Sequence, residues 1–424
     1  MNNERLAVID GVRTPFCKMG TSLASISADE LGRVVVNALL VRTGFDPALV
    51  DEVIFGCVAQ PPDAANVARV IALRAGIPQS VPALTVHRNC ASGMEAVTQA
   101  ADRFAAGRGS VFIVGGVESM SQVPLLFKPA AANKFAHLSR AKSLFKKIAA
   151  MSAFRPGDFA PRVGLMLGLT DPVSGLNMGQ TAEVLAREHA ISREAQDAFA
   201  LESHKHAIAA RAKLAEEITP VYDRGKAITE DNGPRENQSP EALAALHAVF
   251  DKKFGTVTAG NSSQITDGAV ALLVMGEKKA LELGLTPLGF LSASAYAGCD
   301  PKRMGLGPAY AIAKAQRASG LALGQADIVE INEAFAAQVI AAEQLMQSDD
   351  FGKSMGLNGA IGSIPPEKLN VNGGAIALGH PVGATGARLV LTSLKELQRR
   401  KARRALVTLC VGGGQGAAIW LERP

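Results

Sequence analysis

The stretch VHRNCASGMEAV, residues 86–97, organises the rest of the chain. It follows an apolar run over residues 81–86 that predicts a buried strand, and a helical pattern extends from Met94 to Phe104. Cys90 therefore lies where a strand turns into a helix. The N–H groups of the first helical turn and the helix dipole are expected to lower the pKa of its thiol and to favour the thiolate. The alternative is a buried structural cysteine, which is the usual fate of a free thiol.

Strands and helices alternate on both sides of this stretch. The pattern predicts strands at 6–9, 53–56, 84–86 and 111–116, with helices at 27–43 and 66–75. Ser27 is a plausible N-cap, and Gly44 and Gly76 lie just beyond the ends of the two helices. This order indicates a parallel or mixed sheet with crossover helices.

The composition favours an ordered α/β protein. The chain has 424 residues, of which 48% are hydrophobic, 20% are charged and 42 are glycines. Five scattered cysteines form no C-x-x-C pair and no metal-ligand spacing, which indicates reduced thiols and no metal site. The N-terminus runs directly into a strand pattern without a signal peptide, and no apolar run is long enough to span a membrane. We therefore expect a cytoplasmic or matrix-like location.

The net charge of +5 is unevenly distributed. Residues 121–162 carry eight Lys or Arg residues against Asp158 alone, so this segment is +7 and the remainder is −2. Such a patch indicates a local anionic partner and argues against a nucleic-acid-binding protein. Residues 135–148 predict an amphipathic helix. Its apolar face either packs on the body of the protein, or residues 128–155 dock on an anionic membrane or on a partner subunit.

Residues 121–256 interrupt the alternation with this basic segment and with long charged helices, such as one predicted at 192–214. We predict an N-terminal half of residues 1–120 that is completed by residues 257–279. We predict an inserted loop domain of residues 121–256 after the strand at 111–116. A C-terminal half covers residues 280–424. A small-residue turn, a helix, an apolar strand and a glycine pair occur in the same order in both halves, which indicates an internal duplication.

The C-terminal half offers three further chemical groups. His380 lies in a glycine-rich loop before a helix, where a neutral imidazole can accept a proton from a thiol. Cys410 ends a strand beside Gly412-Gly413-Gly414, which suits a thiol in proton transfer, although the glycines can equally form a tight turn. Asn332 follows a strand and can fix a water or donate to an oxyanion, with an N-cap as the alternative.

Four motifs in order, NCASGM (89–94), NEAF (332–335), GHPVGATG (379–386) and CVGGG (410–414), resemble the active-site blocks of the thiolases. The resemblance extends from Ala7 to Glu422. It implies the α/β thiolase fold, in which two duplicated βαβαβαββ halves form five layers and a loop domain is inserted in the first half. This agrees with the duplication and the insertion inferred from the residues.

The resemblance also implies roles. Cys90 resembles the nucleophile that becomes an acyl thioester, His380 the base that activates it, and Cys410 the acid or base at the Cα of acetyl-CoA. Asn332, through a bound water, and His380 would form one oxyanion hole, and the N–H groups of Cys90 and Gly412 the other. Three further positions resemble substrate-binding residues, which are Ser263 near the pantetheine, Arg235 near CoA and Met304 in the acyl pocket.

The implied reaction is thiolytic cleavage of 3-ketoacyl-CoA by CoA, or its reversal. Coenzyme A is a co-substrate, and no tightly bound cofactor is expected. The region 121–177 and the stretch 348–368 resemble thiolase subunits of fatty-acid β-oxidation complexes, whereas Asn332 stands where those subunits often carry His. Asn177 stands where many short-chain thiolases have His. The resemblance implies a homodimer or a dimer of dimers.

Three alternatives remain at this stage. The first is a biosynthetic acetoacetyl-CoA thiolase. The second is a decarboxylating ketoacyl synthase of the same fold, against which Cys410 and the NEAF block argue. The third is a non-catalytic lipid-binding subunit, against which the presence of Cys90, His380 and Cys410 argues.

Overall fold

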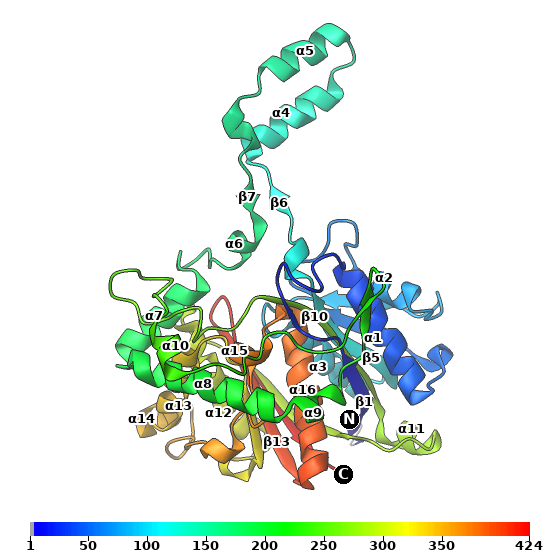
Figure 1. Ribbon diagram of the computed structural model, residues 1–424. Coiled ribbons are helices and arrows are strands. Elements are labelled where there is room, and N and C mark those ends of the chain that lie inside the picture. The colour runs from blue at the N-terminus through cyan, green and yellow to red at the C-terminus, as the bar shows by residue number, and fades with distance from the viewer. Residues whose placement is uncertain (1–3) are drawn as a thin grey trace.

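One mixed sheet runs through the body of the protein (Figure 1). The structure is a computed structural model that describes residues 4–424. The strand order is β12-β13-β14-β11-β1-β10-β5-β3-β4, and the short β2 (Cys17–Lys18) pairs with β10. β1 and β11 join the two halves of the molecule by a short antiparallel pairing.

The N-terminal half forms most of the elements that the sequence predicts. They are β1 (Leu6–Arg13), α1 (Ala28–Thr43), β3 (Glu52–Gly56), α2 (Val67–Arg74), β4 (Ala83–Val86), α3 (Ser92–Ala105), β5 (Val111–Glu118) and β10 (Thr266–Gly276). Gly44 ends α1 with a φ of 60°, and the Asn66 side chain caps α2. The strand expected to be buried over residues 81–86 is wrong in part. β4 begins at Ala83 and is half-buried, because it lies at the edge of the sheet.

The C-terminal half repeats the same arrangement. Its elements are β11 (Gly289–Gly298), α12 (Gly307–Ser319), β12 (Ile328–Ile331), α13 (Ala336–Met346), α16 (Val382–Arg400), β13 (Arg404–Val411) and β14 (Gln415–Glu422). β1-β10-β5-β3 and β11-β14-β13-β12 have the same order and the same directions, with two antiparallel pairings followed by one parallel pairing. The counterpart of β4 is reduced to one parallel bridge between Val329 and Leu369. The predicted duplication is confirmed.

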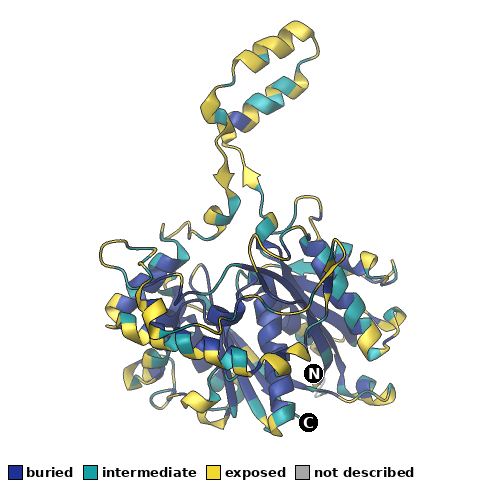
Figure 2. Cartoon of the chain, viewed as in Figure 1, coloured by how far each residue is buried: buried dark blue, intermediate teal, exposed yellow. Residues whose placement is uncertain are grey.

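The two halves stack as five layers. α1 and α2 pack on the outer face of the N-terminal strands, and α12 packs on β11, β13 and β14. Between the two sets of strands lie α3 and α16, which contact each other; α3 also contacts the N-terminal strands, and α16 contacts strands of both halves. Every residue of α16 from Gly383 to Leu397 is buried (Figure 2). The centre of the molecule is therefore a helical layer to which each half contributes one helix.

The segment between β5 and β10 contains a projecting arm (Figure 1). We define the arm as residues 125–163, from β6 (Leu125–Leu126) to the antiparallel β7 (Arg162–Val163). At its far end α4 (Pro129–Arg140) and α5 (Leu144–Ser152) pack against each other. The helix predicted over residues 135–148 is therefore two helices. Of the two alternatives for its apolar face, packing on the body is wrong, because the arm stands away from the body and is mostly exposed (Figure 2).

The remainder of this segment returns to the body. It comprises α6 (Gly164–Gly168), α7 (Met178–Glu188), α8 (Arg193–Ala209), α9 (Arg211–Ala215), β8 (Val221–Asp223), β9 (Lys226–Ile228) and α10 (Pro240–Ala244). The helix predicted over 192–214 is divided at Ala210, which ends α8 and begins α9. Three short elements complete the body, which are α11 (Glu277–Glu282), α14 (Asp349–Ser354) and α15 (Ala375–Leu378).

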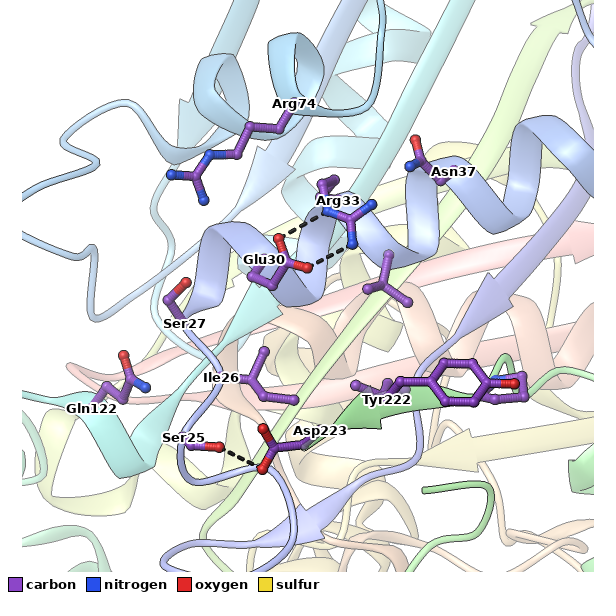
Figure 3. A pocket seen from close by; sticks show the side chains of 13 residues that line it. Ser25, Ile26, Ser27, Glu30, Arg33, Asn37, Arg74, Gln122, Tyr222 and Asp223 are labelled. Atoms are coloured by element: carbon purple, nitrogen blue, oxygen red, sulfur yellow. Dashed lines mark hydrogen bonds and ion pairs between the residues drawn. The ribbon is translucent and has the colours of Figure 1, made fainter. Parts of the chain in front are cut away.

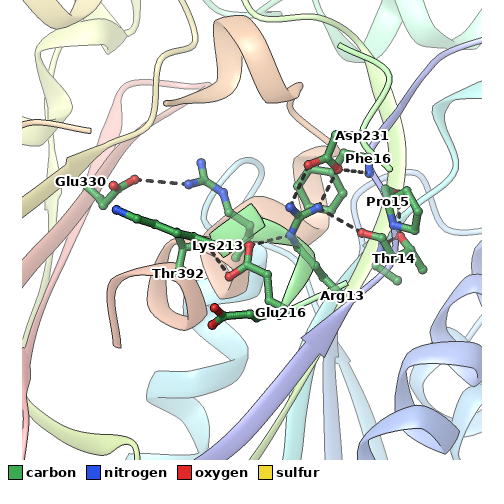
Figure 4. Close-up of polar contacts among 12 residues, drawn as sticks. Arg13, Thr14, Pro15, Phe16, Lys213, Glu216, Asp231, Glu330 and Thr392 are labelled. Carbon is green, nitrogen blue, oxygen red and sulfur yellow. Dashed lines mark hydrogen bonds and ion pairs between the residues drawn. The ribbon is translucent and has the colours of Figure 1, made fainter. Parts of the chain in front are cut away.

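Buried ion pairs fasten this segment to both halves (Figure 4). The Arg13 guanidinium on β1 donates to Glu217 at 2.7 Å and to Asp231 at 2.7 and 2.8 Å. Glu217 also accepts from the Thr392 hydroxyl on α16 at 3.1 Å. Replacing one partner of such a pair leaves a buried charge uncompensated, which costs about 3–5 kcal/mol. This network holds the strand β1, the segment and α16 in one fixed relation.

No helix in residues 4–424 is both long enough and apolar enough to cross a membrane.

Candidate active site

Cys90 lies in a tight turn between β4 and α3. Asn89 has a positive φ of 44°, a conformation that Asn tolerates better than most residues. The backbone N–H of Arg88 donates to the Ser92 hydroxyl at 2.9 Å, and that hydroxyl donates to the Asn89 carbonyl at 2.7 Å. The Asn89 amide reaches across to the Gly412 carbonyl at 2.7 Å. The turn that presents Cys90 is thus fixed against the end of β13.

The helices α3 and α16 cross in direct backbone contact. A Cβ atom at Gly93 would lie 2.9 Å from the carbonyl oxygen of Gly383, and one at Gly386 would lie 2.4 Å from a backbone nitrogen of α3. Glycine permits this approach because it has no side chain. Cys90 precedes Gly93 by three residues, and His380 precedes Gly383 by three residues. The crossing therefore brings Cys90 and His380, each just before the start of its helix, into the same region.

The Cys90 thiol is in a mixed environment. Burial raises the pKa of the thiol, hydrogen bonds from the N–H groups of Gly412 and of Cys90 itself lower it, and the Glu118 carboxylate raises it. The net pKa is above the ordinary value. The sequence-based expectation of a lowered pKa is therefore wrong, because burial outweighs the two N–H groups. A neutral thiol needs a base before it can act as a nucleophile, and the two N–H groups of Gly412 and Cys90 both lie beside its sulfur.

His380 has the properties of such a base. Its Nδ1 lies 2.6 Å from the Thr385 hydroxyl, and that hydroxyl donates to the Pro381 carbonyl at 3.1 Å. Because the hydroxyl proton is used there, Nδ1 carries the ring proton and Nε2 keeps its lone pair. Nε2 is buried and has no hydrogen-bond partner among residues 4–424. Burial, with the nearby Arg388 charge, lowers the His380 pKa to about 4, so the imidazole is neutral at pH 7.

Asn332 also presents unpaired polar atoms. It follows β12, and its backbone N–H donates to the Thr408 carbonyl at 3.0 Å. Both polar atoms of its side chain are buried without a partner in the described residues. Buried polar groups almost always bind a partner, which here must be a water or a ligand. The Asn332 amide thus has the unpaired donor that an oxyanion site requires, and His380 Nε2 supplies a second donor only when it is protonated.

The neighbouring Glu333 holds three segments together. Its carboxylate accepts from the Ser203 hydroxyl at 2.6 Å, from the Asn370 amide at 2.7 Å and from the Ile376 N–H at 3.1 Å. Ser203 belongs to α8, and Ile376 belongs to the glycine-rich segment that leads to His380. Burial raises the pKa of Glu333, while these donors lower it. Glu333 therefore positions Asn332 relative to the loop that carries His380.

Cys410 lies beside Cys90, at the end of β13. The two thiols are close enough that the charge on Cys90 would raise the Cys410 pKa, which burial already raises well above its usual value. Cys410 packs in an apolar cluster with Met304, Phe335 and Met178. The structure therefore brings Cys90, Cys410, Gly412 and Met304 together.

Ser263 and Arg235 lie further from the two thiols. The Ser263 N–H donates to the Ala334 carbonyl at 2.9 Å, which pairs this segment with the NEAF turn. Gln264 accepts from the His380 N–H at 3.0 Å and donates to the Gly233 carbonyl at 3.1 Å, so the loop at 233–235 borders the His380 segment. The Arg235 side chain is exposed. No contact in the described residues joins Ser263 or Arg235 to Cys90.

The surface also has a cavity of about 590 Å³ between α1 and the β8–β9 hairpin (Figure 3). Its charged groups are paired, since Arg33 donates to Glu30 at 2.6 and 2.8 Å and Ser25 donates to Asp223 at 2.8 Å. None of the predicted site residues lines it. Residues 4–424 also contain no group of three His, Cys, Asp or Glu side chains able to hold a metal ion.

Residues 6–278 match the family model of the thiolase N-terminal domain, and residues 285–423 match that of the thiolase C-terminal domain. The chain belongs to the thiolase family. The 3-ketoacyl-CoA thiolase of Pectobacterium atrosepticum is 41% identical over 427 residues, covering 99% of this chain and 97% of that protein. The family and fold predicted from the sequence are confirmed.

Two solved structures extend the comparison. The Bacillus anthracis acetyl-CoA acetyltransferase has a TM-score of 0.86 at 37% identity and covers 99% of both chains. Human mitochondrial 3-ketoacyl-CoA thiolase in complex with CoA has a TM-score of 0.85 at 35% identity, covering 99% of this chain and 98% of that chain. As a thiolase, the protein is an acyltransferase with coenzyme A as its co-substrate. This membership sets aside the ketoacyl synthase alternative.

Sequence reasoning gave no role to three residues of the site. Asn89 and Thr385 stand inside the quoted motifs, but nothing in the sequence shows that they bond to Gly412 and to His380. Glu333 also stands inside a quoted motif, and its three donors come from segments far apart in the chain. The one available signal was the position of Asn89, because Asn is a preferred non-glycine residue where a turn needs a positive φ.

Proposed function

We propose that this thiolase cleaves a 3-ketoacyl-CoA with CoA, giving acetyl-CoA and an acyl-CoA shortened by two carbons. The observation that supports the proposal is the close backbone crossing of α3 and α16, because Cys90 and His380 stand just before the starts of these two helices. The named relatives from Pectobacterium and human mitochondria, both 3-ketoacyl-CoA thiolases, support it.

In the first step Cys90 Sγ attacks the C3 carbonyl of the substrate while its proton passes to His380 Nε2. The C3 oxygen becomes an oxyanion, and the N–H groups of Cys90 and Gly412 donate to it. The neutral imidazole and the raised thiol pKa imply that proton transfer accompanies attack, because no thiolate is stored in the resting enzyme.

In the second step the C2–C3 bond breaks, and the electron pair leaves as the enolate of acetyl-CoA. The protonated His380 Nε2 and a water held by Asn332 stabilise the enolate oxygen. The Cys410 thiol donates its proton to the enolate carbon, which releases acetyl-CoA. The thiol of a second CoA then attacks the acyl carbon while its proton passes to the Cys410 thiolate, and Cys90 leaves as a thiolate that regains its proton from His380, so the kinetics are ping-pong.

Mass spectrometry tests the covalent step. Incubation with acetoacetyl-CoA in the absence of free CoA should leave one acetyl group on Cys90. A peptide map that finds Cys90 unmodified, although the same preparation turns over acetoacetyl-CoA once CoA is added, would exclude this mechanism. A non-catalytic lipid-binding subunit would show neither the adduct nor turnover.

The acyl chain length needs a separate test, because a biosynthetic acetoacetyl-CoA thiolase is the alternative. The similar Bacillus anthracis structure is an acetyl-CoA acetyltransferase, which favours a short chain. The relatives named 3-ketoacyl-CoA thiolase favour a wider range of chain lengths. Thiolysis rates measured across 3-ketoacyl-CoA chain lengths separate the two. Activity restricted to acetoacetyl-CoA would assign the biosynthetic function.

We also propose a homodimer, or a dimer of two such dimers. β4 is a half-buried edge strand that leads directly into the turn of Cys90, and such an edge is stabilised by pairing with a second copy. Light scattering at micromolar concentration should give at least twice the chain mass, and a monomeric mass would contradict the proposal. We further propose a cytoplasmic location. The proposed domains are residues 1–120 with 257–279, residues 121–256 and residues 280–424.

The substrate-contact roles of Ser263 and Arg235 are proposals as well. Ser263 borders the NEAF turn, and Arg235 is an exposed cation on the loop beside the His380 segment, where it can meet the anionic part of CoA. The basic residues 128–155 carry a further proposed contact, with an anionic membrane or with a β-oxidation partner subunit.

A further inference from the structure

A buried ion pair joins α16 to β12. Nη1 of Arg388 on α16 donates to the Glu330 carboxylate on β12 at 3.2 Å, and each side chain is 1% exposed. Figure 4 shows Glu330 at one end of the buried polar contacts and Asp231 at the other. Replacing such a pair by apolar side chains is often neutral or stabilising, so stability alone does not account for its presence.

On β12 the pair is in register with Asn332. Successive side chains of a strand point to opposite faces of the sheet. Ile328 packs in the central apolar cluster with residues of α16, whereas Val329 packs in the outer cluster with residues of α12. Glu330 therefore faces α16. The Asn332 N–H continues the ladder to β13, so Asn332 lies on the same face two residues further along.

On α16 the pair is in register with the residue that holds His380. Thr385, whose hydroxyl lies 2.6 Å from His380 Nδ1, precedes Arg388 by three residues, so both lie on one face of the helix. The helix side thus presents His380 and then Arg388, and the strand side presents Asn332 and then Glu330. The second members are joined by the ion pair. The first members keep buried polar atoms without a partner in residues 4–424.

The charge of Arg388 acts on the site as well as on Glu330. Burial and the carboxylates of Glu333 and Glu217 raise the pKa of Glu330 to about 7, against the opposing charge of Arg388. Burial and the Arg388 charge both lower the pKa of His380. While Glu330 is ionised, its charge offsets that of Arg388, and a proton on His380 is less unfavourable. Once Glu330 is protonated, the charge of Arg388 acts on His380 without compensation.

We propose that the Arg388–Glu330 pair is a positioning element of the catalytic site. It fixes the separation of His380 and Asn332, which serve the same enolate oxygen in the proposed reaction. By offsetting the charge of Arg388, the Glu330 carboxylate also allows His380 to accept the Cys90 proton. Both members of the pair act through His380 and Asn332 and not through a contact of their own with the substrate. The inference rests on the thiolase reaction proposed above.

Glu330→Gln tests the charge at nearly constant side-chain shape. The amide oxygen can still accept from Arg388, but the negative charge is lost. We expect kcat for acetoacetyl-CoA thiolysis to fall about 10- to 100-fold, a part of what a general base contributes, with little change in KM. Single-turnover formation of the acyl-Cys90 adduct should slow by a similar factor, because this step uses His380 as the base.

The pH profile separates a role of the charge from a role in packing. In the wild type kcat should decrease as the pH falls through about 7, because Glu330 takes up a proton and leaves Arg388 uncompensated. Glu330→Gln should lack this inflection and stay at the low rate throughout. Glu330→Asp keeps the carboxylate and should recover most of kcat together with the inflection.

Two further variants serve as controls. Glu52 begins β3 and accepts from Arg103 at 2.7 Å, at the end of α3 far from Cys90, so Glu52→Gln removes the charge of another arginine pair. It should keep the turnover and the pH profile of the wild type. R388M/E330M replaces the ion pair by apolar side chains, and it should keep the melting temperature of the wild type and still lose turnover.

The outcomes distinguish this inference from the proposed reaction. Wild-type kcat and an unchanged pH inflection in Glu330→Gln would overturn the inference and leave the reaction intact. Equal losses in Glu330→Gln and Glu330→Asp, or full turnover by R388M/E330M, would also overturn it, because either result indicates packing. A wild-type protein that does not turn over acetoacetyl-CoA would overturn the reaction itself, and the role of the pair with it.

Discussion

The N-terminal and C-terminal halves have the same sheet, but they use equivalent positions differently. Strand register aligns them, since Gly56 pairs with Gly116 across β3 and β5, and Ile331 pairs with Thr408 across β12 and β13. By this register the C-terminal equivalent of Glu118 is Cys410. Likewise Cys57 and Asn332 each follow the second strand of their half.

In the N-terminal half the equivalent residues, Glu118 and Cys57, have a structural role. The Glu118 carboxylate accepts from the N–H groups of Ala59, Val58 and Gly383 at 2.8, 3.1 and 2.9 Å, and the Cys57 thiol lies 3.6 Å from it. Burial raises the Glu118 pKa, and these donors lower it. Glu118 thus fastens the start of α16 to the other half. The hydrogen bonds of Glu118 are all made to neighbouring segments, which it holds in place. The side-chain amide of Asn332 instead has no hydrogen-bond partner in the described residues and is available to a ligand.

The largest effect is expected from replacing Cys90, the reactive group that the N-terminal half supplies. Cys90→Ser should fold normally and lose at least about a thousandfold in turnover, because an alcohol with a far higher pKa replaces the thiol. Thiolysis of acetoacetyl-CoA measures this. As a control, Cys57→Ser keeps a hydroxyl beside Glu118 and should retain most of the activity. Near-normal turnover by Cys90→Ser would remove Cys90 from the mechanism.

Substitution of Cys410 tests whether this residue takes part in the reaction, in contrast to the equivalent Glu118, which holds backbone segments together. Cys410→Ala should lower overall turnover by about 10²–10⁴-fold, the usual contribution of a general acid or base. The variant should still acylate Cys90 from a reactive acyl donor, but exchange of the Cα protons of acetyl-CoA should be lost by NMR. Unchanged exchange would assign the Cα proton to another group.

The helix crossing tests whether both halves must approach closely. Gly386→Ala places a Cβ 2.4 Å from the backbone of α3, so the helices must separate. We expect a loss of about 1–3 kcal/mol in unfolding free energy and a fall in turnover. Thermal unfolding and thiolysis measure the two effects. Gly324→Ala, where nothing lies within 4 Å, is the control and should change neither. A fully active Gly386→Ala would show that the crossing distance is not critical.

Substitution of Thr385 tests which ring nitrogen of His380 carries the proton. Thr385→Val removes the acceptor that holds the proton on His380 Nδ1, and turnover should fall about 10- to 100-fold, a part of what a general base contributes. Thr385→Ser keeps the hydroxyl and should restore most of the activity. The pH dependence of kcat/KM should change in the valine variant and not in the serine variant. Equal losses in both variants would indicate packing and not tautomer control.

The smallest effect concerns pH. Because the Cys90 pKa is raised, the neutral thiol persists to higher pH, and alkylation of the resting enzyme by iodoacetamide should keep increasing through pH 9.0. Because the His380 pKa is lowered to about 4, kcat/KM should show no inflection from this residue near the ordinary histidine pKa of about 6.5. An alkylation plateau near neutral pH would instead indicate a stored thiolate–imidazolium pair.

The sequence predicted the motifs and the fold better than the environment of each group. Periodicity and glycine positions located α1, α2, α3 and β5, because these elements bury regular apolar faces. It also placed Cys90 before a helix. It could not predict the sign of the Cys90 pKa shift, because burial depends on side chains from both halves. The arm was missed because an amphipathic pattern does not say whether the apolar face is covered. The roles of the site residues and the domain limits stay predictions.

The C-terminal half has no full strand in the place of β4, and this limits how copies of the chain can associate by strand pairing. Where the N-terminal half ends in β4, the C-terminal half has one bridge at Leu369, and Asn370 occupies the β12 edge by bonding to Ile331 at 2.8 and 3.0 Å. A sheet with two open edges can add copies without limit, whereas a sheet with one open edge is used up by a single two-fold pairing. Asn370 thus satisfies the Ile331 N–H and C=O groups that an added strand would pair with, so we expect no copy to add a strand at this edge.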